Sequence, residues 1–280
     1  MKRVVGLMAL LIAVLTVTPA AADFYVIGGG GRLGTAITAL PYTITSPGLY
    51  CLTQNLTLSN PALNAISVNA DDVTIDLMGF CLTGAGKGSG VNNSGIVVAA
   101  TRTNVEIRNG SIKAFGCDGI YSPSGSTGIR VVGLRVRDIG NRGIYLTGSN
   151  NLVMDCVVMD SGAGISVGLS SLVKGSQVVH CDGEGIYISD GSTALGNTVR
   201  SCYYGIYTSL GALVTDNTVS ANIDKGILVT ASCTITRNTA YNNTGTGIAA
   251  GAYCTITNNT TDGLTNGASC FVADNVGNVP

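Results

Sequence analysis

Residues 184–199, EGIYISDGSTALGNTV, contain one full copy of a repeat that runs through most of this sequence. Its first part is a Gly-Ile step, which occurs at Gly95-Ile96, Gly119-Ile120, Gly143-Ile144, Gly164-Ile165, Gly185-Ile186, Gly205-Ile206, Gly226-Ile227 and Gly247-Ile248. The intervals between the glycines are 24, 24, 21, 21, 20, 21 and 21 residues. Its second part follows twelve residues after the glycine, as Asn197-Thr198, Asn217-Thr218, Asn238-Thr239 and Asn259-Thr260. A period this regular indicates stacked copies of one structural unit.

The repeat contains strand pattern only. Short runs of Val, Ile and Thr alternate with Gly, Asn, Ser and Asp clusters, which is typical of short strands separated by turns. Each coil is therefore predicted to hold two or three parallel strands, stacked on the next coil at about 4.8 Å. We expect the isoleucine of each Gly-Ile step to point inward and the glycine to supply turn dihedrals. We expect the asparagines to adopt left-handed dihedrals and to hydrogen-bond up the stack.

The Gly-Ile and Asn-Thr-Val repeats resemble those of the pectate-lyase-like superfamily, and residues 71–80, DDVTIDLMGF, resemble the first coil of its exported bacterial members. The resemblance covers about residues 42–280. It implies an all-β, right-handed, single-stranded parallel β-helix, a solenoid of about nine to eleven coils with 20–24 residues each. The superfamily includes lyases, glycoside hydrolases, epimerases, periplasmic accessory proteins and adhesins, so the fold does not decide the activity.

Residues 1–22 have the pattern of a cleavable signal peptide. Two basic residues precede the apolar run Val4–Val17, and small residues end the segment at Ala22, where we expect cleavage. The apolar run is shorter than the roughly 20 residues that span a bilayer. The sequence thus predicts a secreted or periplasmic protein without a membrane span.

The mature chain is predicted to have two parts, a lead-in and cap over residues 23–50 and a parallel β-helix domain over residues 51–280. Cleavage leaves 13 basic and 16 acidic residues, a net charge of −3. A chain without clustered Lys and Arg is not expected to bind nucleic acid. The sequence leaves the oligomeric state open.

A row of tyrosines is predicted on one outer face of the solenoid. The residue after each Gly-Ile step points outward when the isoleucine points inward, which gives Tyr121, Tyr145, Ser166, Tyr187, Tyr207 and Leu228 in successive coils. The residue before the glycine gives a line of charged and aromatic groups beside it, Asp118, Arg142, Ala163, Glu184, Tyr204, Lys225 and Thr246. Aromatic rings flanked by polar groups suit a sugar chain. The alternative is a tyrosine ladder that only stabilises the sheet.

Candidate catalytic residues are Asp160, Asp182 and Glu184, with Arg142 or Lys225 assisting. The three carboxylates lie in adjacent coils, and glycoside hydrolysis needs two carboxylates about 5–9.5 Å apart. The single histidine, His180, lies in the same stretch, and a surface role is the more common one for such a residue. The Asn-Thr-Asp, Asp-Asp and Gly-His-Gly set of polygalacturonase-like members is absent, as is a dense acidic calcium cluster.

The preferred function is binding of polysaccharide or a cell-surface glycan through Tyr121, Tyr145, Tyr187, Tyr204, Tyr207 and Lys225, without catalysis. Two alternatives stay open, a structural or adhesive surface protein and a polysaccharide lyase or glycoside hydrolase. The coils at residues 143–266 leave almost no room for the long loops that build catalytic clefts. No cofactor is expected; calcium is possible but not indicated.

Nine cysteines allow two expectations. In an exported protein some can pair, and the candidates are Cys51 with Cys81, Cys181 with Cys202, and Cys233 with Cys254. Alternatively they are buried thiols that act as small apolar residues in a stack. No C-x-x-C motif occurs, so a metal or redox site is not predicted.

Overall fold

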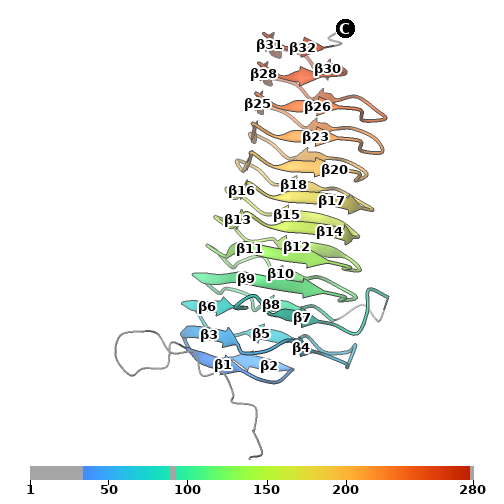
Figure 1. Cartoon of the computed structure of the whole chain (residues 1–280). Helices are drawn as coiled ribbons and strands as arrows, with labels where there is room; N and C mark the ends of the chain where they lie inside the picture. The colour runs from blue at the N-terminus through green and yellow to red at the C-terminus, as the bar shows by residue number, and fades with distance from the viewer. Residues whose placement is uncertain (1–33, 89–92, 278–280) are drawn as a thin grey trace, which may run out of the picture. The chain divides into compact units, whose positions relative to one another are not determined.

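The computed structural model describes residues 34–88 and 93–277. In that part of the chain all regular secondary structure is β-strand. The strands stack as successive coils of a right-handed parallel β-helix (Figure 1), which confirms the predicted fold class. The predicted signal peptide, residues 1–22, lies outside the described residues. Two sheets run the length of the stack, one of 21 strands and one of 11.

Each coil has three sides, and the strands form three rows. The first row holds β1 (Thr35–Ile37), β3 (Gly48–Leu52), β6 (Val73–Asp76), β9 (Val105–Lys113), β11 (Arg130–Arg137), β13 (Leu152–Met154), β16 (Leu172–Lys174), β19 (Thr193–Leu195), β22 (Leu213–Thr215), β25 (Thr234–Thr236), β28 (Thr255–Thr257) and β31 (Phe271–Ala273). The second row holds β4 (Leu56–Thr57), β7 (Cys81–Thr83), β14 (Val157–Ser161), β17 (Gln177–Cys181), β20 (Thr198–Arg200), β23 (Thr218–Ser220), β26 (Thr239–Tyr241), β29 (Thr260–Thr261) and β32 (Val276–Gly277). The long strands β9 and β11 belong to both rows and join them into the 21-stranded sheet.

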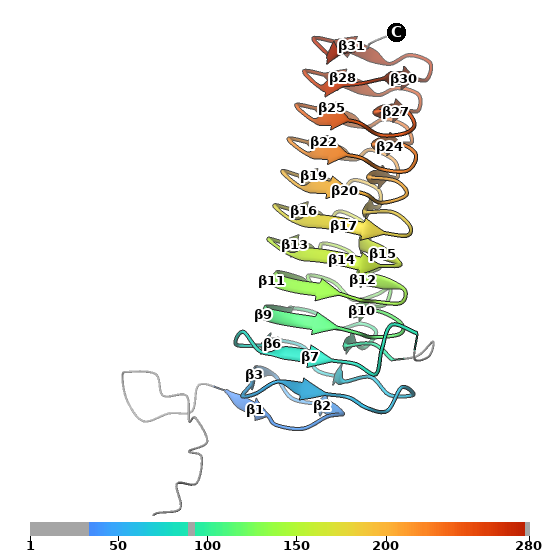
Figure 2. The ribbon, with the colours of Figure 1, turned by 45° about the vertical axis from the view of Figure 1, so that its right-hand side comes forward.

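The third row is the separate 11-stranded sheet, visible behind the others when the solenoid is turned (Figure 2). It holds β2 (Tyr42–Ile44), β5 (Ile66–Val68), β8 (Ile96–Val98), β10 (Ile120–Ser122), β12 (Arg142–Leu146), β15 (Ala163–Val167), β18 (Ile186–Ile188), β21 (Ile206–Thr208), β24 (Ile227–Val229), β27 (Ile248–Ala250) and β30 (Leu264–Asn266). Strands β1 and β2 come from the predicted lead-in, residues 23–50, yet they pair in parallel with β3 and β5. They therefore form a first coil of the solenoid.

The core is a column of aligned side chains. Each isoleucine of the Gly-Ile steps pairs with its equivalent in the next coil, as in Ile120 with Ile144 and Ile144 with Ile165. All eight are at most 1% exposed. The predicted inward orientation is confirmed, and each coil buries its apolar side only because a neighbour stacks on it.

The glycines of these steps have a role that differs from the prediction. None of the eight has a φ in the left-handed region, so they do not supply turn dihedrals. A Cβ at any of them would instead collide with the coil stacked above or with an inward side chain. Glycine is required because the backbones approach closely at this position.

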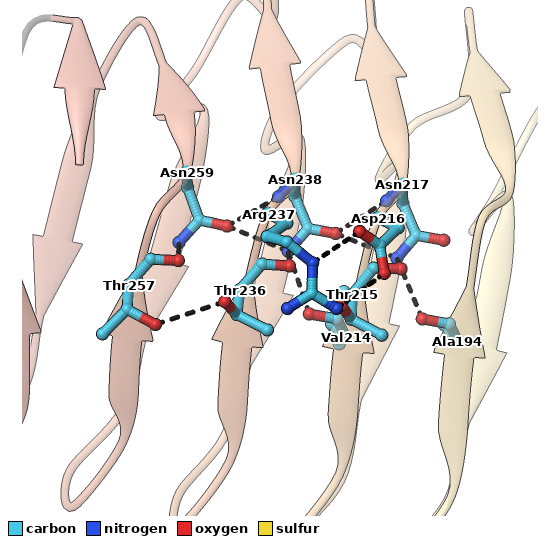
Figure 3. A network of polar contacts seen from close by, with 10 residues as sticks. All are labelled: Ala194, Val214, Thr215, Asp216, Asn217, Thr236, Arg237, Asn238, Thr257 and Asn259. Atoms are coloured by element: carbon cyan, nitrogen blue, oxygen red, sulfur yellow. Dashed lines mark hydrogen bonds and ion pairs between the residues drawn. The ribbon is translucent and has the colours of Figure 1, made fainter. Parts of the chain in front are cut away.

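The corners of the coils share one construction. A residue with positive φ, such as Asp216 or Arg237, stands directly before an inward residue whose side chain accepts the backbone N–H of the coil before it. In the corner between the first two rows these inward residues are Asn197, Asn217, Asn238, Asn259 and Asn275. Figure 3 shows the middle three, Asn217, Asn238 and Asn259. The predicted amide ladder is confirmed, but the predicted left-handed dihedrals belong to the residue before each asparagine.

The nine cysteines are free thiols in the structure, so the three expected pairs are not bonded there. Six of them occupy the inward corner position in place of asparagine or serine: Cys156, Cys181, Cys202, Cys233, Cys254 and Cys270. The Cys156 thiol donates to the carbonyls of Met154 and Val131, as the Asn217 amide donates to those of Thr215 and Ala194. Five of these thiols are buried and Cys270 is half-buried, so they pack as small groups in the stack, the second of the two expectations.

Candidate functional site

The tyrosine row lies on the outer face of the third row of strands. Register pairs join Tyr121 to Tyr145, Tyr145 to Ser166, Ser166 to Tyr187, and Tyr187 to Tyr207. The tyrosines are partly exposed, whereas the isoleucine before each is buried. The ring centroids are 5.5 Å apart within both the Tyr121–Tyr145 pair and the Tyr187–Tyr207 pair. Ser166 is the one interruption between them.

A hollow of about 300 Å³ opens where the row is interrupted. Its floor is lined by the small residues Ala163 and Ser166 of β15 and by Gly168, which directly follows that strand. The wall from the preceding coil consists of Arg142, Tyr145 and Thr147, and the wall from the following coil of Glu184, Tyr187 and Ser189. The hollow exists because one coil has small residues at three positions that are larger in both flanking coils.

The hollow has two charged residues, Arg142 and Glu184. The Arg142 guanidinium lies over the Tyr145 ring, 4.1 Å from its centroid, an arrangement that a cation–π attraction stabilises. Within residues 34–88 and 93–277, neither Arg142 nor Glu184 belongs to an ion pair. Arg142 can donate hydrogen bonds to a ligand, and the Glu184 carboxylate can accept them.

A second aromatic group adjoins the hollow at the next coils. The ring centroid of Tyr204 lies 6.2 Å from that of Tyr207 and 4.8 Å from that of Tyr203. Lys225 Nζ lies 5.7 Å from the Tyr204 ring centroid and 3.1 Å from an Asp224 carboxylate oxygen. These residues extend the tyrosine surface toward the C-terminal coils, with the lysine charge paired to its neighbour.

Asp118 is a buried carboxyl group beneath the same face. It is 4% exposed, and its Oδ1 accepts hydrogen bonds from Asn141 Nδ2 at 2.9 Å and from the Arg142 backbone N–H at 3.1 Å. Burial raises the pKa of Asp118 above its usual value of 3.8. The sequence placed Asp118 in the outward line of charges, and its burial was missed.

The raised pKa of Asp118 makes a prediction about pH. The native state holds the proton more tightly than the unfolded chain does, so this group lowers the free energy of unfolding as pH rises from 3.8 through its folded pKa. We expect Asp118→Asn to raise the thermal midpoint at pH 7, with the gap narrowing toward pH 4. Thermal unfolding followed by circular dichroism at several pH values measures this. Asp155→Asn, at an exposed corner, is the control, and a lower midpoint for Asp118→Asn at pH 7 would contradict the prediction.

The structure brings two of the four predicted catalytic residues to the hollow and leaves the other two outside it. Arg142 and Glu184 line the hollow, but Asp160 and Asp182 do not. Asp160 lies 3.7 Å from His180 Nδ1, and these two residues occupy equivalent positive-φ corner positions in adjacent coils. Asp182 lies 3.7 Å from Lys87 Nζ, which also donates to the Asp160 carbonyl at 3.2 Å. This exposed charge cluster is at the corner between the second and third rows.

Comparisons with known proteins agree with the architecture. A family model described as "Periplasmic copper-binding protein (NosD)" matches residues 64–244. The A-module of mannuronan C-5 epimerase AlgE6 from Azotobacter vinelandii is 14% identical with a TM-score of 0.62, over 83% of this chain and 71% of that chain. The AlgE4 A-module from the same organism is 12% identical with a TM-score of 0.58, over 86% and 88%. The periplasmic alginate epimerase AlgG is 11% identical with a TM-score of 0.51, over 82% and 69%.

At these identities the structural likeness shows the fold alone. The comparison with curated proteins gave no match. Among the described residues no helix is long and apolar enough to cross a membrane.

The description of the family model names copper, so we asked whether the side chains of this chain could ligate it. In the part of the chain that the structure describes, no group of three or more His, Cys, Asp or Glu side chains is placed to hold a metal ion. The thiols that copper would favour are mostly buried in the corner stacks, and burial raises the pKa of Cys156 to about 11. The described residues therefore do not fit a copper centre.

Proposed function

This chain belongs to the NosD family, and from that premise we propose that it is a periplasmic β-helix protein that binds polysaccharide without cleaving it. In this proposal residues 1–22 are a signal peptide that directs export and is cleaved after Ala22. The ligand site is the hollow on the third row of strands together with its flanking tyrosines. In this proposal the predicted β-helix domain, residues 51–280, is the part of the chain that binds the polysaccharide.

The observation that carries this proposal is the chemistry of the hollow. Tyr145 and Tyr187 offer ring surfaces on opposite walls, which suit the C–H faces of a sugar. Arg142 supplies donors and Glu184 acceptors for hydroxyl groups, and neither is neutralised by an ion pair within the described residues. A few convergent polar groups around aromatic walls are typical of small-ligand sites.

Binding without cleavage is supported by the carboxylates. Hydrolysis needs two of them about 5–9.5 Å apart across the scissile bond, and among the described residues Glu184 is the only carboxylate that lines the hollow. The side chain of Asp118 is buried and lies three coils from Glu184, about 14 Å at the strand spacing. Asp160 and Asp182 belong to the corner cluster. Lyase chemistry with Arg142 as the base would need an acidic calcium cluster, and none occurs among the described residues.

Removing both aromatic walls tests the proposal. We expect the Tyr145→Ala/Tyr187→Ala double variant of the mature protein to lose roughly tenfold to hundredfold in glycan affinity, because each aromatic contact is worth about 1 kcal/mol. Affinity is measured on a polysaccharide array and then by calorimetry. Reducing-end assays and absorbance at 235 nm on the same samples detect cleavage.

The matched control is Tyr241→Ala/Tyr253→Ala, which removes two exposed tyrosines outside the hollow, 43% and 68% exposed. This control should bind as the unchanged protein does. Equal affinity of both double variants would count against the site. Release of product would replace the binding proposal with an enzyme that uses Glu184.

A structural or adhesive surface protein is the second candidate. The observation in its favour is that the tyrosines contact one another, in the Tyr121–Tyr145 and Tyr187–Tyr207 pairs, and so stabilise the sheet without any ligand. The absence of binding to every glycan on the array would favour this reading.

A further inference from the structure

We infer that the hollow is the place of one missing tyrosine ring, and that a single neutral pyranose ring of the bound polysaccharide fills it while the sugar chain crosses the solenoid axis. This inference rests on the proposed function and adds to it the occupant and its direction. The alternative direction is a sugar chain laid along the tyrosine row, parallel to the solenoid axis.

The size of the gap supports one ring. Tyr145 and Tyr187 are the register neighbours of Ser166 on either side, so the two tyrosines are two coils apart, about 9.6 Å at the strand spacing. Tyrosines in adjacent coils already place their ring centroids 5.5 Å apart on this face. Ser166, 8% exposed, leaves the intervening position without a ring. A six-membered sugar ring has about the size of the absent side chain.

The shape of the floor supports a chain that crosses the axis. The small residues Ala163, Ser166 and Gly168 follow one another along a single coil, so the hollow runs in the strand direction. Along the axis, it is closed on one side by the wall that includes Tyr145 and on the other by the wall that includes Tyr187. A chain along the axis would have to pass over both walls and would leave the hollow empty.

The charges of the walls support a neutral sugar. Arg142 stands on one wall and Glu184 on the other, at equivalent places before the Gly-Ile step, with Ala163 between them. Their charges are opposite, and among the described residues neither side chain belongs to an ion pair. Hydroxyl groups can accept from Arg142 and donate to Glu184 at once, whereas a sugar carboxylate would meet the Glu184 carboxylate.

The two binding directions predict opposite effects of Ser166→Tyr. If one sugar ring occupies the gap, the new side chain takes its place and binding is lost. If the chain runs along the axis, the substitution completes a row of five tyrosines and binding is strengthened. The fold accepts tyrosine at this position in four other coils, so the variant is compatible with the register.

The experiment measures binding of cellohexaose, mannohexaose and a hexameric oligouronate to the mature protein by calorimetry. We expect the unchanged protein to bind a neutral hexamer and Ser166→Tyr to bind it at least tenfold more weakly. Ala163→Leu fills the hollow from another position and should have the same effect, which covers the case in which Ser166→Tyr folds poorly. Leu228→Tyr adds a tyrosine to the row outside the hollow and should change the affinity less than twofold.

Equal or tighter binding by both filled variants would overturn the inference while leaving the proposed function in place. Binding of the oligouronate alone would overturn the neutral occupant. No binding of any glycan by the unchanged protein would remove the proposed function and the inference together.

Discussion

Alanine at Gly164 is expected to lower the free energy of unfolding of the solenoid by about 3 kcal/mol. The added Cβ would lie against the carbonyl oxygen of Gly185 in the next coil and against a methyl group of Val178, closer than van der Waals contact allows. One of these atoms is backbone held in a parallel ladder, so the coil spacing itself would have to change. Urea unfolding of the mature variant, followed by circular dichroism, measures the loss.

Gly196 is the matched control, because this glycine of the same stack has a positive φ but no close neighbour at its Cβ position. Its φ is +64°, and a Cβ there would meet nothing within 4 Å. The next three coils have Asp216, Arg237 and Asn258 at this corner position, all with positive φ. Gly196→Asn should therefore change the unfolding free energy by less than about 0.5 kcal/mol. If Gly164→Ala were as stable as this control, the close approach of the neighbouring coil would not be the reason why glycine is required at residue 164.

The fold could be predicted because a single sequence pattern, the regular repeat of the Gly-Ile step, determines it. The period places Ile144, Ile165 and Ile186 at the same point of successive coils, and any chain that buries them together must stack parallel strands. The period does not show which atoms surround a position. For this reason the roles of the glycines and of the left-handed corner residues were wrong, although their places in the repeat were right.

The candidate site was predictable only in part. The outward tyrosines follow from strand alternation, but the hollow depends on the small residues between them. Aligning the coils shows Ala163, Ser166 and Gly168 together in one coil, a signal that attention to large side chains overlooks. Asp182 and Glu184 are two residues apart in sequence, yet a corner contact holds the first while the second lines the hollow. The contact from Lys87 comes from outside the repeat, so no periodicity predicts it.

Replacing Asn238 by alanine is expected to lower the free energy of unfolding by about 4 kcal/mol, because its amide serves three coils. Asn238 Oδ1 accepts from the backbone N–H and the side-chain amide of Asn217, at 3.0 and 2.9 Å. Its Nδ2 donates to the carbonyl of Val214 at 2.9 Å, to that of Thr236 at 3.1 Å, and to Asn259 Oδ1 at 3.0 Å (Figure 3). Alanine leaves these groups buried without partners.

The neighbouring residue Arg237 provides a control, because it belongs to the same turn but its side chain is not part of the asparagine ladder. Its side chain is 60% exposed and pairs with Asp216 at 2.8 Å, an interaction worth at most about 1 kcal/mol at a surface. Arg237 has a positive φ, which asparagine tolerates. Arg237→Asn should therefore leave the free energy of unfolding within about 1 kcal/mol of that of the unchanged protein.

Asn238→Gly tests whether asparagine recurs at this corner to form the turn or to form the amide ladder. If Asn238 served the turn, glycine would adopt any required dihedral and stability would be retained. Because Asn238 has no positive φ and its amide fills the corner, Asn238→Gly should be at least as destabilising as Asn238→Ala. Asn238→Ser, which reproduces the residue at Ser176 in the same ladder, should fall between alanine and asparagine, since its hydroxyl can still accept the Asn217 N–H. Chemical unfolding of the three variants ranks them, and a glycine variant as stable as the unchanged protein would show that the amide ladder does not hold the corner.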